Sequence, residues 1–244
     1  MKKEFHNTQI SQLWNLYSQD MIRSPISSTL IFRTINYFNF KNILEIGFFE
    51  GYTFGIMLES CMPGSSLTTL DIDFKMNLYN LYYKDTAHTK DKNIRFINSK
   101  SNDHENFLFG NEKPYDCILV DANADYDGYL HDLLSSVNSI SENGIIIADH
   151  YKLSNEVDMA IDDFLKLDHN FVPFMCDGQA LFFHHKYHNC ATFLDEFVTN
   201  TFQPMCTTFN LPFKNCIVKH IEERPVLVCN NLELYKFYCK LNNI

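Results

Sequence analysis

Apolar runs of strand length alternate with helical patterns between residue 28 and about residue 185. Such runs predict strands at 42–46, 66–71, 94–98, 115–121 and 145–148. The run at 115–121 is apolar on consecutive positions from Cys117 to Val120, which is typical of a strand that is covered on both faces. Strands that alternate with helices need right-handed crossovers. The pattern therefore predicts an α/β fold, with a doubly wound and mainly parallel sheet between two layers of helices.

Helices are predicted at 28–38, from the turn after residue 47 to about 61, after residue 73, at 126–140, and after a cap at Ser154 or Asn155. Asn143-Gly144 is predicted to turn the chain into the strand at 145–148. Runs at 171–176 and 180–183, joined by Asp177-Gly178, predict an antiparallel hairpin at the edge of the sheet. With this hairpin the predicted sheet has seven strands.

Three segments are expected in the chain. Residues 1–40 form an N-terminal helical segment that is a candidate substrate lid, and residues 41–187 form the α/β domain. Residues 188–244 break the alternation and are expected to be a C-terminal extension. It would hold a helix at 191–200, strand-like runs at 217–221 and 226–229, and a last helix at 232–241.

Composition narrows the classes of function. The formal net charge of −10 argues against a broad grip on nucleic acid, which needs clustered Lys and Arg. Eight cysteines without a Cys-x-x-Cys pair favour reduced, buried thiols over disulfides. Neither a signal peptide nor a membrane-spanning run is recognised, so a cytoplasmic protein without a membrane partner is expected. A homodimer is a candidate arrangement.

A glycine turn follows the first predicted strand and carries the clearest chemical signal. Gly47 and Gly51 have the spacing Gly-x-x-x-Gly, which differs from both the dinucleotide-binding and the phosphate-loop patterns. Asp71 ends the next strand, 24 residues after Gly47, the spacing at which a carboxylate reaches a ribose. These residues predict a nucleoside-type cofactor whose reactive part is not a phosphate.

Further polar groups follow the other predicted strands, at Ser99 to Ser101, at Asp121 and at Asp149-His150. Ligands of open parallel sheets bind beyond the carboxyl ends of the strands, so these groups are expected to share one edge. Helix capping and loop hydrogen bonding are the alternative roles for Asp121, Asp149 and Ser101. For the glycines, the alternative is an ordinary strand-to-helix turn.

The run 44–53 resembles the first motif of class I S-adenosylmethionine-dependent methyltransferases, which have a Rossmann-like fold. The resemblance is nearest to the catechol and caffeoyl-CoA type of cation-dependent O-methyltransferase. Met21-Ile22-Arg23-Ser24-Pro25, Pro63-Gly64 with 67–73, Val120-Asp121-Ala122 and Ala148-Asp149-His150 resemble further motifs of that family in the same order. The resemblance covers about residues 20–185 and implies an enzyme that methylates a hydroxyl of a small molecule, such as a phenol, catechol or sugar.

Carried over to this chain, the resemblance implies a set of residues that bind S-adenosyl-L-methionine. They are Glu45, Gly47, Phe49, Gly51, Tyr52, Asp71, Ile72, Ser101 and Asp121. Asp121, Asp149 and His150 are the implied ligands of a divalent cation, Mg²⁺ or Mn²⁺, and His150 and Asp121 are the implied catalytic residues. The cation would hold the acceptor hydroxyl and lower its pKa.

Two departures from the family pattern leave alternatives open. Ala124 stands where the family commonly has a lysine, and His150 stands where it has an asparagine. Imidazole is a softer ligand than Mg²⁺ favours, so His150 acting as a general base without a metal is the second hypothesis. A cofactor-binding module that does not catalyse, and an RNA or cap methyltransferase, are the alternative functions. The run 184–190 suggests zinc, but an exposed polar run is the preferred interpretation.

Overall fold

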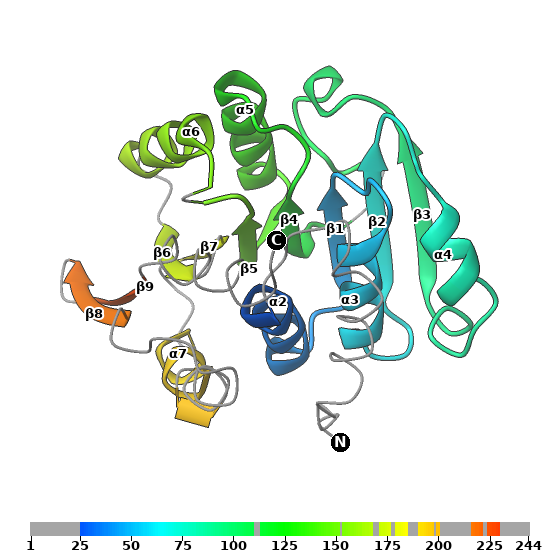
Figure 1. The fold of residues 1–244 in the computed structure, drawn as a ribbon, viewed down its shortest axis with the longest axis horizontal. Helices are drawn as coiled ribbons and strands as arrows, with labels where there is room; N and C mark the ends of the chain where they lie inside the picture. The colour runs from blue at the N-terminus through cyan, green and yellow to red at the C-terminus, as the bar shows by residue number, and fades with distance from the viewer. Residues whose placement is uncertain are drawn as a thin grey trace, which may run out of the picture.

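The structure is a computed structural model that describes residues 25–109, 113–151, 153–167, 171–176, 179–184, 190–197, 199–200, 216–221 and 224–229. Its elements alternate along the chain as the sequence pattern predicts (Figure 1). In chain order they are α2 (Pro25–Phe38), β1 (Asn42–Ile46), α3 (Tyr52–Ser60), β2 (Ser66–Asp71), α4 (Asn77–Tyr82), β3 (Asn93–Asn98), the 3₁₀ turn η1 (Ser101–Asp103), β4 (Tyr115–Val120), α5 (Tyr126–Val137), β5 (Ile140–Ala148), α6 (Asn155–Lys166), β6 (Phe171–Cys176), β7 (Gln179–His184), α7 (Cys190–Phe197), β8 (Cys216–Ile221) and β9 (Arg224–Cys229). The predicted helix at 232–241 lies outside the described residues.

One mixed sheet runs through the molecule in the order β3-β2-β1-β4-β5-β7-β6-β9-β8. The first five of these strands are parallel to one another, as predicted, and β7 pairs with β5 in the antiparallel direction. The strand order reverses between β1 and β4. Because neighbouring connections leave in opposite directions at such a point, it opens a crevice at the carboxyl ends of the strands.

The predicted count of seven strands is wrong, because the sheet has nine among the described residues. β6 and β7 form an antiparallel hairpin, but this hairpin does not lie at the edge of the sheet. β9 pairs with β6 through Met175 and Val228, and β8 closes the sheet. The backbone groups on the outer side of β6 are thus covered by a segment of the predicted C-terminal extension, in keeping with the general tendency to cover strand edges.

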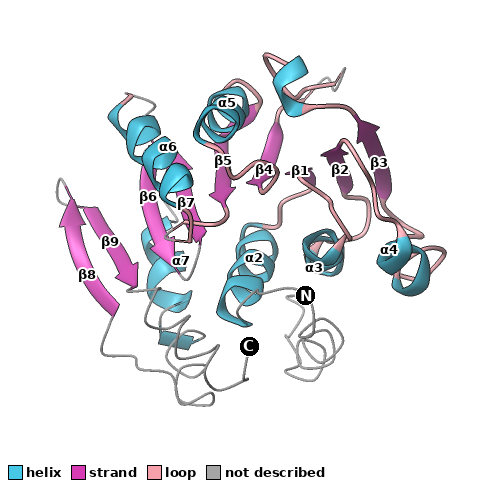
Figure 2. Cartoon of the chain, turned by 45° about the horizontal axis from the view of Figure 1, so that its top comes forward, coloured by secondary structure: helices cyan, strands magenta, loops and turns pink. Residues whose placement is uncertain are grey.

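Helices cover both faces of the sheet, so the fold is the doubly wound α/β sandwich that the sequence predicts. Figure 2 shows α5 and α6 on one face and α2, α3 and α7 on the other. Side chains that alternate along the strands divide between two apolar cores, with Cys117 and Leu119 of β4 in the core of α2 and α3 and Ile118 and Val120 in the core of α5 and α6. Cys61 and Cys117 are buried thiols, as expected.

The helix α2 begins earlier than predicted, at Pro25, whose fixed φ suits the first helical position. It ends at a left-handed Asn39, where the amide of Phe40 donates to the Ile35 carbonyl at 3.1 Å. Leu30 and Ile35 are fully buried, so α2 belongs to the core. A lid made from residues 1–40 would therefore be confined to the segment ahead of α2.

The strand β5 also begins earlier than predicted, at Ile140 rather than after Asn143-Gly144. Tyr115 of β4 pairs with Ile140, but Cys117 pairs with Ile145, so the chain bulges between these two pairs. The turn residues thus serve as a bulge within a paired strand. In the described part of the chain, no helix combines the length and the apolar character needed to cross a membrane.

Gly47 provides a test of how the ends of β1 and β4 meet. Its φ is +99°, and a Cβ built on it would lie 2.3 Å from the carbonyl oxygen of Asp121. Gly64 has a φ of +80°, and a Cβ built on it would have no atom within 4 Å. Gly64→Ala therefore measures the cost of the backbone conformation alone. We expect Gly64→Ala to cost about 1–2 kcal/mol and Gly47→Ala to cost at least about 2 kcal/mol more, in urea unfolding followed by circular dichroism. Equal losses would contradict the close contact.

Candidate active site

The glycine loop between β1 and α3 is shaped by contacts within the protein. Gly47 continues the ladder by donating its amide to the Leu70 carbonyl at 2.8 Å. Gly51, in the left-handed conformation at φ 83°, is the N-cap residue of α3. A Cβ on Gly51 would lie 2.5 Å from the Phe48 ring. Gly51 is among the residues implied to bind the cofactor, and in the structure its missing side chain makes room for this ring.

The carboxylate of Asp71 fastens the loop to the end of β2. One oxygen accepts hydrogen bonds from the amides of Phe48 and Phe49 at 2.7 and 2.8 Å. The other oxygen accepts from the amide of Asp73 at 2.9 Å. Each carboxylate oxygen has about two acceptor positions, so the second oxygen can still accept one more bond. Asp71 therefore fixes the loop and keeps an acceptor position at the end of β2.

Two large apolar side chains close to Asp71 are exposed. Phe49 is 44% exposed and Ile72 is 63% exposed. The Phe49 backbone adopts a left-handed φ of 48°, and its ring lies under the Lys75 ammonium, with 4.0 Å between the nitrogen and the ring centroid. Exposed apolar side chains beside an anchored carboxylate suit a ligand with a flat ring and hydroxyl groups.

Glu45 and Tyr52 are directed into the protein. Glu45 is buried and accepts a hydrogen bond from the Thr69 hydroxyl at 2.9 Å. The Tyr52 hydroxyl lies 3.0 Å from the hydroxyl of Ser28 in α2. These two predicted cofactor residues therefore support the loop from below, and α2 is tied to the start of α3.

Asp121, Asp149 and His150 come together at the ends of β4 and β5. The amide of Asp121 donates to the Ile46 carbonyl at 2.8 Å and that of Asp149 to the Val120 carbonyl at 3.0 Å, so the three strand ends lie side by side. One ligand atom from each of the three residues lies within 4.8 Å of the others. The strand-end principle thus placed these residues correctly, although it does not establish what they bind.

His150 is held in an unusual position. Its φ is 61°, which is uncommon for a residue with a side chain. The Tyr129 hydroxyl donates to the Asp149 carbonyl at 2.5 Å and holds the preceding residue in place. The His150 Nδ1 lies 3.3 Å from an Asp121 oxygen and 3.8 Å from an Asp149 oxygen. Nδ1 is enclosed, yet it has no partner with hydrogen-bond geometry in the described structure, so these are contacts between polar groups only.

Ser101 opens the 3₁₀ turn after β3 and is buried. The His131 Nε2 lies 3.2 Å from the Ser101 carbonyl and 3.0 Å from the His104 carbonyl. Because both partners are acceptors, Nε2 carries the proton. His131 is half-buried and stabilises the turn that holds Ser101.

Asp132 was not predicted as part of the site. The fully buried positions of α5 include Tyr129, Asp132 and Leu133. Asp132 lies three residues after Tyr129 on this face, a spacing that could have revealed it. Within the described residues neither carboxylate oxygen has a hydrogen bond of good geometry. Burial raises the pKa of Asp132 to about 6, although the nearby Ser101 hydroxyl and the His131 ring lower it.

Comparisons with known proteins agree with this arrangement. Residues 44–151 match a family model described as a methyltransferase domain. The stretch includes the glycine loop, Asp71, Asp121, Asp149 and His150. The predicted resemblance to methyltransferases is thereby confirmed for the domain that carries the candidate site. No curated protein matches the sequence.

Solved structures share the fold at low sequence identity. The O-methyltransferase from Bacillus cereus, in complex with SAH, is 14% identical with a TM-score of 0.54, over 74% of this chain and 92% of that one. SAH-bound methyltransferase PaMTH1 from Podospora anserina is 19% identical with a TM-score of 0.55, over 74% and 88%. O-methyltransferase TomG from Streptomyces achromogenes, in complex with SAM, is 16% identical with a TM-score of 0.53, over 75% and 92%. These likenesses confirm the Rossmann-like methyltransferase fold.

The buried carboxyl of Asp132 makes stability depend on pH. Its pKa rises from 3.8 in the unfolded chain to about 6 in the folded protein. Between these values the folded protein holds a proton that the unfolded chain has released, so the free energy of unfolding falls as the pH rises through this window. Asp132→Asn removes this loss. We expect it to stabilise the protein at pH 7–8 by about 1–3 kcal/mol, with the difference vanishing near pH 4.

Urea unfolding at a series of pH values measures this difference. Asp127→Asn is the matched control, because Asp127 is exposed on the same helix and its substitution should not reproduce the gain. A difference between Asp132→Asn and the unsubstituted protein that stayed constant from pH 4 to 8 would contradict a buried, titrating carboxyl.

Proposed function

Because residues 44–151 form a methyltransferase domain, we propose that the protein transfers the methyl group of S-adenosylmethionine to a hydroxyl oxygen of a small molecule. One observation carries the proposal: the anchored glycine loop and the group of Asp121, Asp149 and His150 share one edge of the parallel sheet, at its topological switch point. The loop offers a place for a nucleoside, and the polar group lies where an acceptor would have to be oriented.

The residues around the loop fit the cofactor. Asp71 keeps an acceptor position for a ribose hydroxyl, and the exposed Ile72 and Phe49 offer apolar surface for the nucleoside. Ser101 lies on the neighbouring turn, where it would border the base. Glu45, Gly47, Gly51 and Tyr52 act by shaping the loop. That solved neighbours of the same fold were crystallised with SAM or SAH supports this assignment.

The polar group fits a divalent cation, Mg²⁺ or Mn²⁺. Two ligand atoms that are each about 2.1 Å from one ion lie about 3–4 Å apart. The distances from the His150 Nδ1 to Asp121 and Asp149, 3.3 and 3.8 Å, fall in this range. The enclosed Nδ1 without a hydrogen-bond partner is the atom that such an ion would satisfy. Two carboxylates suit either ion, and the imidazole favours Mn²⁺.

The cation would supply an electrophile that lowers the pKa of the acceptor hydroxyl. Asp121 and Asp149, with His150, would hold this electrophile at the ends of β4 and β5. Ala124 contributes no charge there, and an imidazole that binds the cation through Nδ1 carries its own proton on Nε2, so the acceptor's proton would pass to water. The second candidate mechanism is methyl transfer without a metal. His150 would then be the base that takes the acceptor's proton, since its side chain is 44% exposed and its Nδ1 lies toward the Asp121 carboxylate.

The choice of acceptor rests on the segments around the crevice. We propose that residues ahead of α2 act as the substrate lid, and that residues 188–244 support the sheet edge through β8 and β9. A phenol, catechol or sugar hydroxyl is the expected acceptor class. The net charge of −10 favours these small molecules over nucleic acid. Self-association as a homodimer stays a prediction.

Calorimetry with S-adenosylmethionine and S-adenosylhomocysteine tests the cofactor assignment. Both should bind the unsubstituted protein, and Asp71→Ala should weaken binding by about tenfold or more, because charged hydrogen bonds to the ribose are lost. Asp73→Ala is the matched control: its exposed side chain can be removed while its backbone amide remains. Failure of both ligands to bind at about 1 mM would refute the cofactor assignment.

Electron paramagnetic resonance of Mn²⁺ tests the cation without knowledge of the acceptor. We expect one Mn²⁺ site per chain. Asp149→Asn and His150→Ala should each lower the affinity for Mn²⁺ by about tenfold or more. Asp127→Asn removes a carboxylate of the same protein outside the site and should leave Mn²⁺ binding unchanged. If His150→Ala binds Mn²⁺ normally but abolishes methyl transfer, and EDTA leaves the transfer rate unchanged, the mechanism without a metal is favoured instead.

A further inference from the structure

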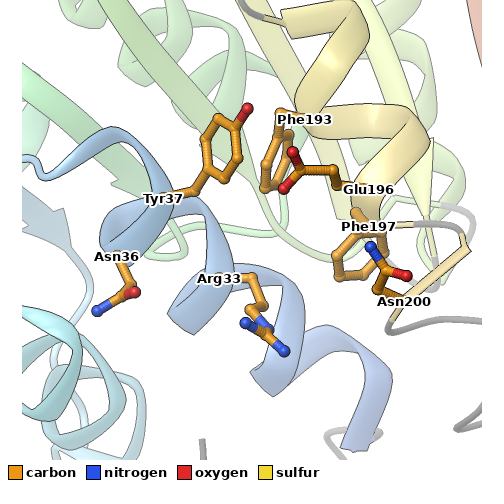
Figure 3. A pocket seen from close by; sticks show the side chains of 7 residues that line it. All are labelled: Arg33, Asn36, Tyr37, Phe193, Glu196, Phe197 and Asn200. Carbon is orange, nitrogen blue, oxygen red and sulfur yellow. The ribbon is translucent and has the colours of Figure 1, made fainter. Parts of the chain in front are cut away.

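Arg33 and Asp132 are charged side chains whose enclosed polar atoms have no hydrogen-bond partner in the described part of the chain. Arg33 belongs to α2 and lines a small cavity with Phe193 and Glu196 of α7 (Figure 3). This part of α2 leads into the start of β1, so Arg33 lies toward the edge of the sheet opposite the candidate active site. Asp132 of α5, by contrast, lies beside Ser101 at that site. Of the two side chains, Asp132 is therefore the one placed to act on the proposed cofactor.

The turn that holds Ser101 follows the end of β3, next to the end of β2. Asp71 of β2 pairs with Asn98 of β3, and the amide of Ser99 donates to the Asp71 carbonyl at 3.1 Å. The Asn98 side chain donates to the Ile72 carbonyl at 3.0 Å. A nucleoside whose ribose binds Asp71 can therefore extend its base past Ile72 toward the turn at Ser101.

Asp132 supports this turn from inside the protein. It has no exposed surface, whereas Ser101 keeps 7% of its surface exposed, so a ligand can reach Ser101 but not Asp132. Burial raises the pKa of Asp132 to about 6, and the nearby Ser101 hydroxyl opposes this rise. A hydroxyl that lowers the pKa of a carboxyl does so by stabilising the ionised form, which means that it acts as a donor to the carboxylate.

The Ser101 hydroxyl has one proton to donate and two lone pairs that can accept. In the structure it donates to the Asn102 Oδ1 at 3.4 Å, a long hydrogen bond. The Asp132 carboxylate is a better acceptor, because hydrogen bonds to charged groups are roughly twice as strong as those between neutral groups. A rotation of the Ser101 hydroxyl from Asn102 to Asp132 would give the buried carboxylate the partner that it lacks.

We propose that Asp132 is a positioning residue for the base of the cofactor. Its carboxylate accepts a hydrogen bond from the Ser101 hydroxyl, which leaves the lone pairs of the Ser101 oxygen for a donor on the ligand. The ring nitrogens of adenine accept hydrogen bonds, and its 6-amino group is the donor. Asp132 thus selects a 6-aminopurine through Ser101 without touching it. The inference rests on the proposed function, because it assumes that the cofactor is S-adenosylmethionine.

This arrangement requires an ionised Asp132. A protonated carboxyl can donate its own proton to the Ser101 oxygen and occupy the lone pair that the amino group needs. The pKa of Asp132 in the protein without ligand is about 6. The cofactor should therefore bind more tightly above pH 6, and its affinity should fall as the pH falls through 6.

Other titratable groups lie near Asp132 on α5 and on the turn. Among the described residues, His131 lowers the pKa of Asp132 and Asp125 raises it. The His104 Nε2 lies 3.0 Å from the Ser99 hydroxyl, and the next acid of the turn, Asp103, is exposed. A pH dependence that came from any of these groups would persist when Asp132 is replaced, so a variant of Asp132 distinguishes them.

Titration calorimetry with S-adenosylhomocysteine between pH 5 and 7.5, in the presence of EDTA, tests the role of Asp132. The Kd of the unsubstituted protein should be about three- to tenfold higher at pH 5 than at pH 7.5, which is the effect of one hydrogen bond. Asp132→Asn should bind with a constant Kd over this range, because its amide oxygen is an acceptor at every pH. Asp127→Asn removes an exposed carboxylate of the same helix and should keep the pH dependence.

Two comparisons test whether Asp132 acts through Ser101. Ser101→Ala should weaken binding at pH 7.5 by about three- to tenfold and remove the pH dependence, and adding Asp132→Asn to it should have no further effect. An analogue of S-adenosylhomocysteine with hydrogen in place of the 6-amino group should bind the unsubstituted protein with the same loss and without pH dependence. This second comparison does not depend on the folding of a variant.

The outcomes separate this inference from the proposed function. A Kd for S-adenosylhomocysteine that is constant from pH 5 to 7.5 or lower at pH 5, a pH dependence that persists in Asp132→Asn, or equal binding of the analogue would each overturn the role of Asp132. The proposed function would stand in all of these cases, since the cofactor product still binds. Failure of S-adenosylhomocysteine to bind at any pH would overturn both.

Discussion

The close contact between Gly47 and the backbone of Asp121 is the constraint on which the candidate site depends. The ends of β1 and β4 approach so closely that a Cβ on Gly47 would lie 2.3 Å from the Asp121 carbonyl oxygen. This approach puts the loop that follows β1 beside the first acid of the polar group. A side chain at position 47 would push the two strand ends apart, and with them the two halves of the site. The requirement for glycine is therefore set by strand packing and not by a ligand.

Local pattern was sufficient to predict most of the parallel sheet. The bounds of β1 and β2 agree with the predicted runs, because each is a short apolar segment between polar turns. The rule that the polar ends of parallel strands meet at one edge then predicted that Asp121, Asp149 and His150 lie close together. The structure shows this proximity. Periodicity and topology carry this information, since both follow from the backbone geometry of strands and crossovers.

Features that depend on long-range pairing were not predicted. The early start of β5 follows from its pairing with Tyr115, which no local signal reveals. β8 and β9 join the sheet through β6, and their short runs gave no partner. Glu45 was expected at the cofactor, yet its carboxylate is turned toward Thr69 of the neighbouring strand. In each case the position of the side chain or strand depends on a partner that is distant in sequence. A single sequence does not reveal which residue that partner is.

The helix α5 joins the two halves of the candidate site. Tyr129 holds the turn at Asp149 through its hydroxyl, next to the proposed cation ligands. Half a turn further along, His131 donates to the Ser101 carbonyl, and Asp132 is buried beside the same serine. Both ends of the crevice are therefore fixed by neighbouring residues of a single rigid element. The residues that hold the turn at Asp149 and the turn at Ser101 lie within one turn of the same helix, so the position of α5 sets the spacing between the proposed cation ligands and the proposed nucleoside site.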